Sequence, residues 1–166
     1  MTSTTHRETQ IVADPDVPLI RITREFDAPR GKVFRAHTDP ELVAQWLGPR
    51  DLTMTIDHYD CRTGGSYRYV HSQGDEEYGF HGCFHEVRPD ELIVQTFTFE
   101  GWPDGVALEK LVLEDLGDGR TRLTATSLCD SFADRDAMLS SGMDVGVNEG
   151  YAKLDELLAR DGAGAR

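Results

Sequence analysis

The sequence predicts a single α+β domain, in which a curved antiparallel sheet of about six to seven strands wraps around one long C-terminal helix. Two short helices are expected after the first strand. Short runs of alternating polar and apolar residues, separated by turn residues, dominate the chain from Ile20 to Leu128. Only after Met143 does the apolar spacing become that of a long helix. A length of 166 residues suits one domain with its own core.

The first strand and the two short helices are predicted before residue 50. Residues 20–26 alternate apolar and polar side chains, as in a strand with one buried face. A short helical stripe follows at residues 33–37. Asp39 and Pro40 begin a second helix, because Asp is a good N-cap and Pro fits the first helical position. The Gly-Pro pair at 48–49 ends this helix.

The remaining strands are joined by short turns. The clearest turn is Gly117-Asp118-Gly119, which is a strong hairpin signal. Short turns leave no room for the crossover connections of parallel strands, so the sheet must be largely antiparallel. The strands are expected near residues 52–57, 67–69, 78–87, 92–99, 106–116 and 121–128.

The terminal helix is predicted from apolar residues that recur at helical spacing from Met143 to Leu158. A single long helix can cover the apolar face that an open sheet leaves. Gly146 and Gly150 each cost a helix up to about 1 kcal/mol relative to Ala. We therefore expect these glycines to leave room for the close approach of a backbone or a ligand.

Domain limits and location follow from composition. The domain is expected to span residues 18–160, after a flexible N-terminal tail at 1–17 and before a frayed C-terminal tail at 161–166. The apolar runs are too short for a transmembrane helix, and the N-terminus lacks the apolar core of a signal peptide. The expected location is the cytoplasm.

Charge and cysteine content exclude several functional classes. The net charge is -13, from 30 acidic and 17 basic residues, so the surface repels nucleic-acid backbones and anionic lipids. We therefore expect neither a nucleic-acid partner nor a membrane partner. The three cysteines, Cys61, Cys83 and Cys129, form no CxxC pair, which argues against a disulfide framework.

Four segments carry a resemblance to a known superfamily. They are FDAPRGKVFRAHTDPELVAQWLGP (Phe26 to Pro49), RTGGSYRY (Arg62 to Tyr69), FHGCFHEVRPDELIVQTF (Phe80 to Phe97) and GMDVGVNEGYAKLDELLAR (Gly142 to Arg160). The sequence resembles the START-like superfamily, also called SRPBCC or polyketide-cyclase/birch-pollen-allergen-like. Within it, the chain is most similar to the homologues of the activator of the heat-shock-protein-ninety ATPase.

This resemblance implies a helix-grip fold with a cavity between the sheet and the long helix. Members bind lipids, polyketides or other apolar small molecules, and others are cyclases. No universal catalytic motif can be carried over to this chain. Relatives often have a second Trp near Val147, whereas this chain reads GVNEG from Gly146 to Gly150.

Ten residues are the candidates for a ligand-binding cavity. Apolar pockets are lined mainly by aromatic and aliphatic side chains, with a few polar groups that orient the ligand. We expect His58 and His81 to be the polar contacts. Which side of the strands between 67 and 99 faces the cavity is left open. The expected wall residues are Trp46, Tyr67, Tyr69, Phe97, Phe99, Met143, Val147 and Tyr151.

A metal site is a weaker alternative. His81 and Cys83 share one face of a strand and could bind zinc together with His58 or Cys61. No CxxC, HxxxH or HExxH pattern supports this, so we expect neither a metal nor a cofactor.

Three functions are compatible with these features. The first is a binding protein for a small apolar or aromatic ligand. The second is an enzyme that uses a cavity His as the base for cyclisation, dehydration or hydrolysis. The third is an interaction module that docks a chaperone or a second copy of itself, as in a homodimer. We expect binding rather than catalysis, because the sequence shows residue types but not their convergence.

Overall fold

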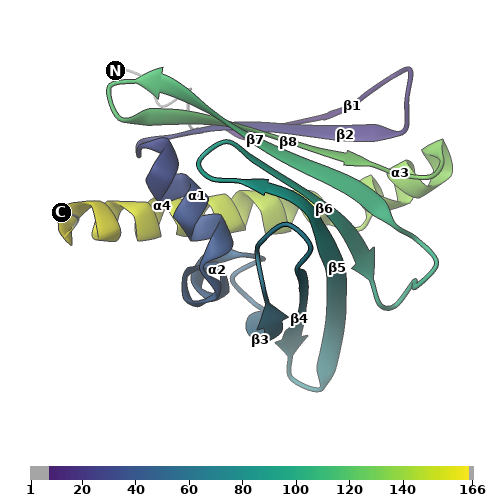
Figure 1. Ribbon diagram of the computed structural model, residues 1–166. Coiled ribbons are helices and arrows are strands. Elements are labelled where there is room, and N and C mark those ends of the chain that lie inside the picture. Colours follow the sequence, from purple (N-terminus) through teal and green to yellow (C-terminus); the bar gives the residue numbers. More distant parts are fainter. Residues whose placement is uncertain (1–7, 165–166) are drawn as a thin grey trace.

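The computed structural model describes residues 8–164, with side chains described through Arg160, and has the α+β architecture that the sequence predicts (Figure 1). Two short helices follow the first long strand, and a long helix ends the chain. The elements are β1 (Gln10–Ala13), β2 (Leu19–Phe26), α1 (Arg30–Thr38), α2 (Pro40–Trp46), β3 (Thr53–Tyr59), β4 (Ser66–Gln73), β5 (Glu76–Arg88), β6 (Leu92–Phe99), β7 (Ala107–Gly117), β8 (Arg120–Leu128), α3 (Phe132–Ser140) and α4 (Met143–Gly164).

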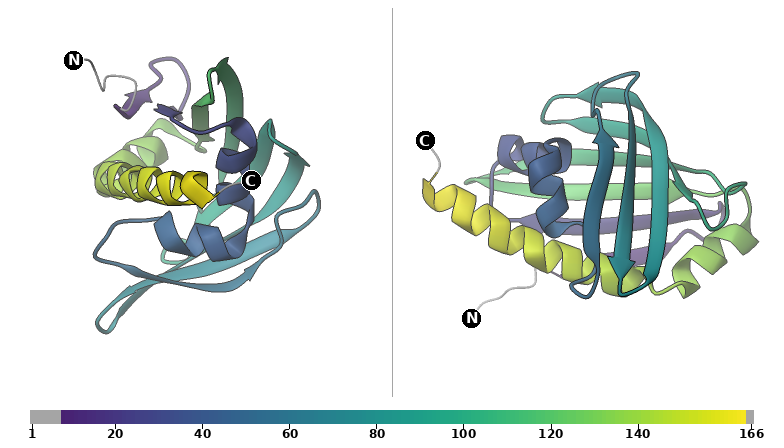
Figure 2. Two further views of the ribbon diagram at one scale, coloured as in Figure 1. Left: turned by 90° about the vertical axis from the view of Figure 1, so that its left-hand side faces the viewer. Right: turned by 90° about the horizontal axis from the view of Figure 1, so that it is seen from below.

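The strands form one antiparallel sheet in the order β1-β2-β8-β7-β6-β5-β4-β3. Figure 2 shows that this sheet curves around α4, which lies inside the curve. Irregularities in the β3–β4 and β5–β6 pairings locally bend the strands. The helix-grip fold is therefore confirmed. None of the described helices combines the length and apolar character needed to cross a membrane.

The sheet has eight strands, one more than the sequence predicts, because β1 lies in the segment predicted to be a flexible tail. The prediction of a tail is wrong for Gln10–Ala13, which pair with β2 in the register Gln10↔Thr23. An edge strand like this is held by backbone hydrogen bonds, so it needs no strict apolar alternation. Residues 1–7 of the predicted tail lie outside the described residues. At the other end, α4 continues to Gly164, and residues 165–166 lie outside the described part.

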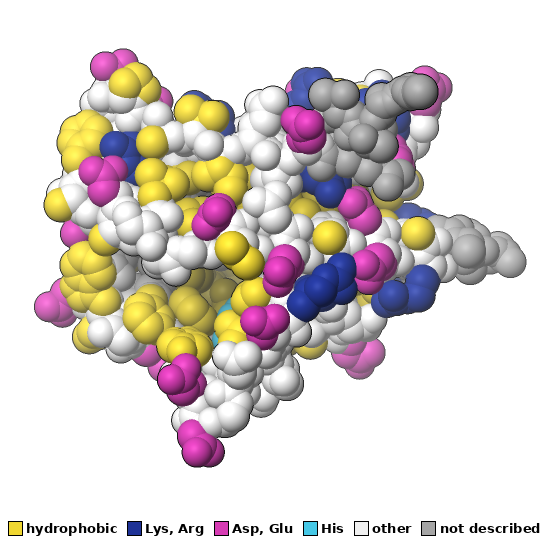
Figure 3. Space-filling model, turned by 180° about the vertical axis from the view of Figure 1, so that it is seen from behind, with side chains coloured by type: hydrophobic (Ala, Val, Ile, Leu, Met, Phe, Trp, Pro, Cys, Tyr) yellow, Lys and Arg dark blue, Asp and Glu magenta, His cyan; other side chains and the backbone are white. Residues whose placement is uncertain are grey.

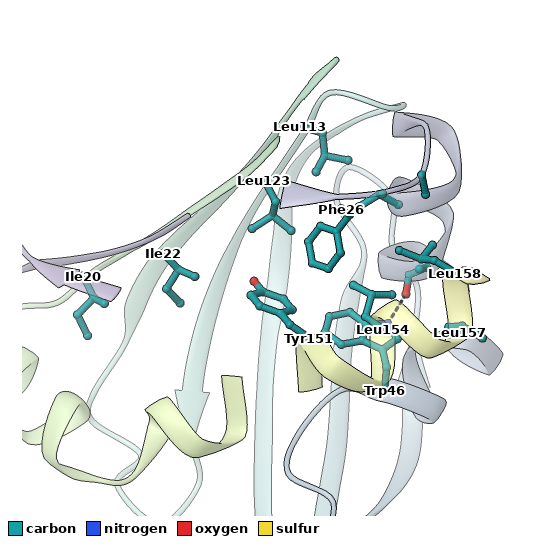
Figure 4. Packing of buried hydrophobic residues seen from close by; sticks show 13 residues of the cluster. Ile20, Ile22, Phe26, Trp46, Leu113, Leu123, Tyr151, Leu154, Leu157 and Leu158 are labelled. Atoms are coloured by element: carbon teal, nitrogen blue, oxygen red, sulfur yellow. Dashed lines mark hydrogen bonds between the residues drawn. The ribbon is translucent and has the colours of Figure 1, made fainter. Parts of the chain in front are cut away.

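The core lies at one end of the concave sheet face. Phe26, Leu113 and Leu123 point inward from β2, β7 and β8 and are at most 3% exposed. Figure 4 shows these side chains in one cluster with Leu154 of α4. Trp46 closes the cluster from α2, and its indole Nε1 donates a hydrogen bond of 2.8 Å to the Ala36 carbonyl. Burial of these large side chains stabilises this end of the sheet.

The C-terminal half of α4 is buried in the core, whereas Met143 and Val147 of its N-terminal half only reach the edge of the core and are partly buried. Leu154, Leu157 and Leu158 are at most 6% exposed, but Val145 is 51% exposed. Gly150 marks the point at which α4 meets α2, because an added Cβ would lie 3.2 Å from the Trp46 carbonyl oxygen. The room that the sequence predicts at this glycine is therefore taken by backbone.

A buried ion pair also ties α4 to β2. Arg24 Nη1 and Nη2 donate to the two carboxylate oxygens of Asp155 over 3.1 and 2.7 Å. The side chain of Arg24 is 6% exposed and that of Asp155 is 23% exposed. Without its carboxylate partner, a guanidinium buried this deeply would be an unpaired charge that destabilises the folded protein.

We expect Asp155→Ala to lower the free energy of unfolding by about 2 to 3 kcal/mol, because it leaves the Arg24 guanidinium buried and unpaired. The matched control is Glu156→Ala, since the pair between Glu156 and Arg50 is about half exposed on both sides. That control should cost less than about 1 kcal/mol. Urea denaturation measures both values, and equal losses would contradict this role for the Arg24–Asp155 pair.

Candidate ligand-binding cavity

A cavity of about 790 Å³ lies between the concave sheet face and the N-terminal half of α4. Strands β4 to β8 supply much of one wall, α2, α3 and α4 lie on the other side, and β2, α1 and β3 contribute one residue each: Ile22, His37 and Tyr59. Figure 3 shows, on the face opposite to that of Figure 1, a hollow with mainly hydrophobic side chains on its wall. The cavity thus lies beside the packed core and under the part of α4 that the sheet does not hold.

Side-chain size explains why the space is open at this end. Along β8, the inward positions change from Leu123 in the core to Ala125 and Ser127 at the cavity. Along β7 they change from Leu113 to Ala107. Because successive inward side chains are two residues apart, a strand can fill the core at one end and leave space at the other.

Aromatic rings cover much of the cavity wall. Tyr67 and Tyr69 of β4 stack with their centroids 6.0 Å apart. Phe80 of β5 stacks on Tyr69 and on Phe97 of β6, at 5.4 Å in each case. These rings form a continuous aromatic surface across three strands, which favours an apolar or aromatic ligand.

A polar row crosses the wall on three neighbouring strands. Gln95 of β6 is paired with Glu109 of β7, and Glu109 is paired with Ser127 of β8. Ser127 Oγ donates to Glu109 Oε2 over 2.7 Å, and Gln95 Nε2 lies 3.3 Å from Glu109 Oε1. The Tyr67 hydroxyl extends this row, because it lies 3.3 Å from Gln95 Nε2 and donates to the Thr96 carbonyl.

Burial shifts the pKa values of the groups that line the cavity. It raises the pKa of Glu109 to about 6, against the opposing effect of the hydrogen bonds from Ser127 and Gln95. It lowers the pKa of His37 to about 4, although a hydrogen bond to the Val33 carbonyl opposes this shift. At neutral pH, the cavity therefore holds a carboxylate and a neutral imidazole.

The family of activator of Hsp90 ATPase homolog 1-like proteins matches residues 27–159. The chain belongs to that family. The matched segment begins directly after β2 and ends in the C-terminal half of α4, so it contains most of the cavity lining and most of the core. No curated protein matches the sequence.

Solved structures share the fold of this family member. A protein from Rhodobacter sphaeroides is 26% identical, with a TM-score of 0.83, over 92% of this chain and 99% of that one. A protein from Mycobacterium smegmatis is 24% identical, with a TM-score of 0.82, over 91% of this chain and 97% of that one. DynU16, a protein of the dynemicin biosynthetic locus, is 25% identical, with a TM-score of 0.65, over 87% of this chain and 48% of that one.

The apolar and aromatic candidates all lie on the cavity wall of this family member, and their contact with a ligand stays a prediction. The sequence left open which side of the strands between residues 67 and 99 faces the cavity. In the structure, odd-numbered residues of β4 and β6 face inward. The lining candidates are Trp46, Tyr67, Tyr69, Phe97, Phe99, Met143, Val147 and Tyr151.

His58 and His81 do not line the cavity, which corrects their expected role as polar contacts. On β5, Phe80 faces inward, so the adjacent His81 faces outward. His81 Nδ1 lies 2.9 Å from Glu100 Oε2. His58 lies after an irregularity in β3, is about half exposed, and its Nε2 lies 3.1 Å from Ser66 Oγ.

The outward His81 lies beside the ion pair between Arg68 and Glu100. The Arg68 guanidinium, and then His81, hold the pKa of Glu100 down to about 2. Cys83, the partner of His81 in the metal alternative, is exposed. Among the described residues, no three His, Cys, Asp or Glu side chains are grouped where they could hold a metal ion.

Sequence reasoning missed the polar row. Glu109 lies on the same side of its strand as Leu111 and Leu113, because side chains alternate along a strand. A carboxylate on the apolar side of a strand is uncommon, so the sequence did mark Glu109 as a candidate polar group of the cavity. Gln95 and Ser127 gave no comparable signal, since which side of each strand faces inward depends on the register of the whole sheet.

We expect Glu109→Gln to raise the free energy of unfolding by about 1 to 2 kcal/mol at about pH 8. The folded-state pKa of Glu109 lies above its ordinary value of 4.5, so the folded protein holds this proton more tightly than the unfolded chain. Stability is therefore lost as the pH rises from about 4.5 through 6, and the variant avoids that loss. Urea denaturation at about pH 4 and pH 8 measures the difference.

The matched control is Glu114→Gln, because Glu114 lies on the same strand with its side chain exposed. It should show no such gain at high pH. A Glu109 variant that is less stable than wild type at both pH values would contradict the placement of this carboxylate in an apolar cavity.

Proposed function

We propose that this protein binds a small, mainly apolar molecule in the cavity under α4. The observation that carries the proposal is the cavity volume of about 790 Å³ together with its aromatic wall. Ligand pockets typically have volumes of about 300 to 1,000 Å³ and are lined by apolar and aromatic groups with a few polar ones. The polar row on β6, β7 and β8 supplies those polar groups.

The surroundings of the cavity mouth support the same proposal. Phe99, Trp102, Val106 and Val145 line the cavity and are each between 38% and 51% exposed. Exposed apolar side chains that gather in one place commonly mark a binding surface. Here they offer an apolar path from the solvent to the interior.

Family membership adds support without fixing the ligand. The similarity to DynU16 links this fold to a biosynthetic locus. Because one fold hosts many functions, the ligand class has to be argued from the cavity itself.

Catalysis is the second candidate, and one observation favours it. Glu109 and His37 both line the same cavity, so a carboxylate and an imidazole face one ligand space. The His37 ring uses Nδ1 in a 2.7 Å contact with the Val33 carbonyl, and burial keeps the ring neutral at pH 7. The carboxylate is therefore the better base, rather than the histidine that the sequence suggests. Conversion of a bound compound, followed by mass spectrometry, separates catalysis from binding.

The binding test uses the neutral dye Nile red and a variant that fills the cavity. Ala125 lines the cavity on β8, so we expect Ala125→Trp to weaken dye binding at least about tenfold. The matched control is Thr124→Trp, because the adjacent side chain points to the other face of the sheet. Fluorescence titration measures both affinities.

Native mass spectrometry of the freshly purified protein completes the test by revealing a retained small molecule. Wild-type protein that binds no dye and retains no molecule would overturn the proposal. So would equal dye affinity in the Ala125 and Thr124 variants, because it would place the dye outside the cavity.

A further inference from the structure

The polar row is isolated within an apolar wall. On one side of it, Phe97 of β6 is paired with Ala107 of β7. On the other side, Ile93, Leu111 and Ala125 form a cross-strand row on β6, β7 and β8. On the β6 to β8 part of the wall, a ligand that fills the cavity therefore meets one polar place, and Glu109 is at its centre.

The Glu109 carboxylate lacks a cationic partner. Its oxygens accept hydrogen bonds from Ser127 and Gln95, and both donors are neutral. Among the described residues, no Lys, Arg or His side chain forms an ion pair with Glu109, and Arg24 is engaged by Asp155. A carboxylate offers about four acceptor positions, so two remain for a ligand. Glu109 is partly buried, and a partly desolvated carboxylate without a counter-charge is costly, so a cationic ligand would reduce that cost.

The rest of the wall also suits a cation. The aromatic rings that line the cavity present faces that attract positive charge. The charged residues of the lining are Glu109, Asp130 and Asp134, against Lys110 alone. Lys110 is exposed on the strand position next to Glu109, so its side chain lies on the opposite face of the sheet. The net charge of -13 would attract cations to the mouth as well.

We propose that the cavity selects an apolar molecule carrying a protonated amine, which Glu109 binds as its counter-ion. This inference rests on the proposed binding function and names the class of ligand. The apolar body lies against the aromatic wall, and the ammonium group donates hydrogen bonds to the two free acceptor positions of Glu109. Charge-assisted hydrogen bonds of this kind are about twice as strong as neutral ones. An alcohol would bind more weakly, and an organic anion would be repelled.

The amine preference should depend on pH through Glu109. Burial raises the pKa of this carboxyl to about 6, so the ion pair is complete at pH 7.5 and is lost as the pH falls towards 5. Burial lowers the pKa of both His37 and His71, so neither imidazole supplies a competing cation near neutral pH. The other titratable or charged groups of the lining are Tyr59, Tyr67, Tyr69, Tyr78, Lys110, Cys129, Asp130, Asp134 and Tyr151.

The test is displacement of Nile red by three compounds with the same apolar chain: octylamine, octanol and octanoate. For wild-type protein at pH 7.5, we expect octylamine to be the strongest competitor, at least about tenfold better than octanoate, with octanol between them. In Glu109→Gln, octylamine should lose its advantage over octanol, with both inhibition constants corrected for the dye affinity measured on that variant. In Glu114→Gln, the order should be that of wild type.

The outcomes separate this inference from the binding proposal. If wild-type protein does not bind the dye, the proposed function itself fails. If the dye binds but the three compounds compete equally, or octanol exceeds octylamine, the amine preference is wrong and the binding function stands. If octylamine keeps its advantage in Glu109→Gln, or at pH 5 in wild type, Glu109 is not the counter-ion.

Discussion

Leu154, Leu157 and Leu158 are buried in one core cluster with the large inward side chains of β2, β7 and β8 and with residues of α1 and α2, so α4 is held most firmly at its C-terminal end. The Arg24–Asp155 ion pair reinforces the same end. Beyond Gly150, towards its N-terminus, the helix is less buried, and the inward side chains become small along β8, at Ala125 and Ser127, and at Ala107 of β7. The cavity follows from this asymmetry, since a helix packed along its whole length would have closed the space.

The polar row lowers the stability of the folded protein, and the proposed binding function gives a reason for this cost. A carboxylate on an otherwise apolar wall disfavours the folded state at neutral pH, and neutral donors from Ser127 and Gln95 offset only part of this. Proteins commonly tolerate such local destabilisation where a site needs it. Under the proposed function, the same carboxylate would make the cavity selective, because an ion in apolar surroundings interacts strongly with the charge of a ligand.

Much of the fold was predictable, because alternation along the strands and helical spacing after Met143 are strong local signals. The aromatic candidates for the wall could be named, but the sequence left open which side of the strands between residues 67 and 99 faces the cavity. His58 and His81 were misplaced, because the face that a strand residue occupies depends on the sheet register and on irregularities such as the one before His58. Strand β1 was missed because backbone pairing with β2, rather than an apolar pattern, holds Gln10–Ala13 in place.

The most direct test of this account is a crystal structure of the protein soaked with bromobenzene, in which anomalous scattering locates the bromine atom. The account predicts a bromine site between the Met143–Gly150 half of α4 and the inward faces of β6, β7 and β8. It also predicts that the C-terminal half of α4 stays packed on the core. Bromine sites confined to the outer surface, or an α4 packed onto the sheet along its whole length with no space beneath it, would contradict the account.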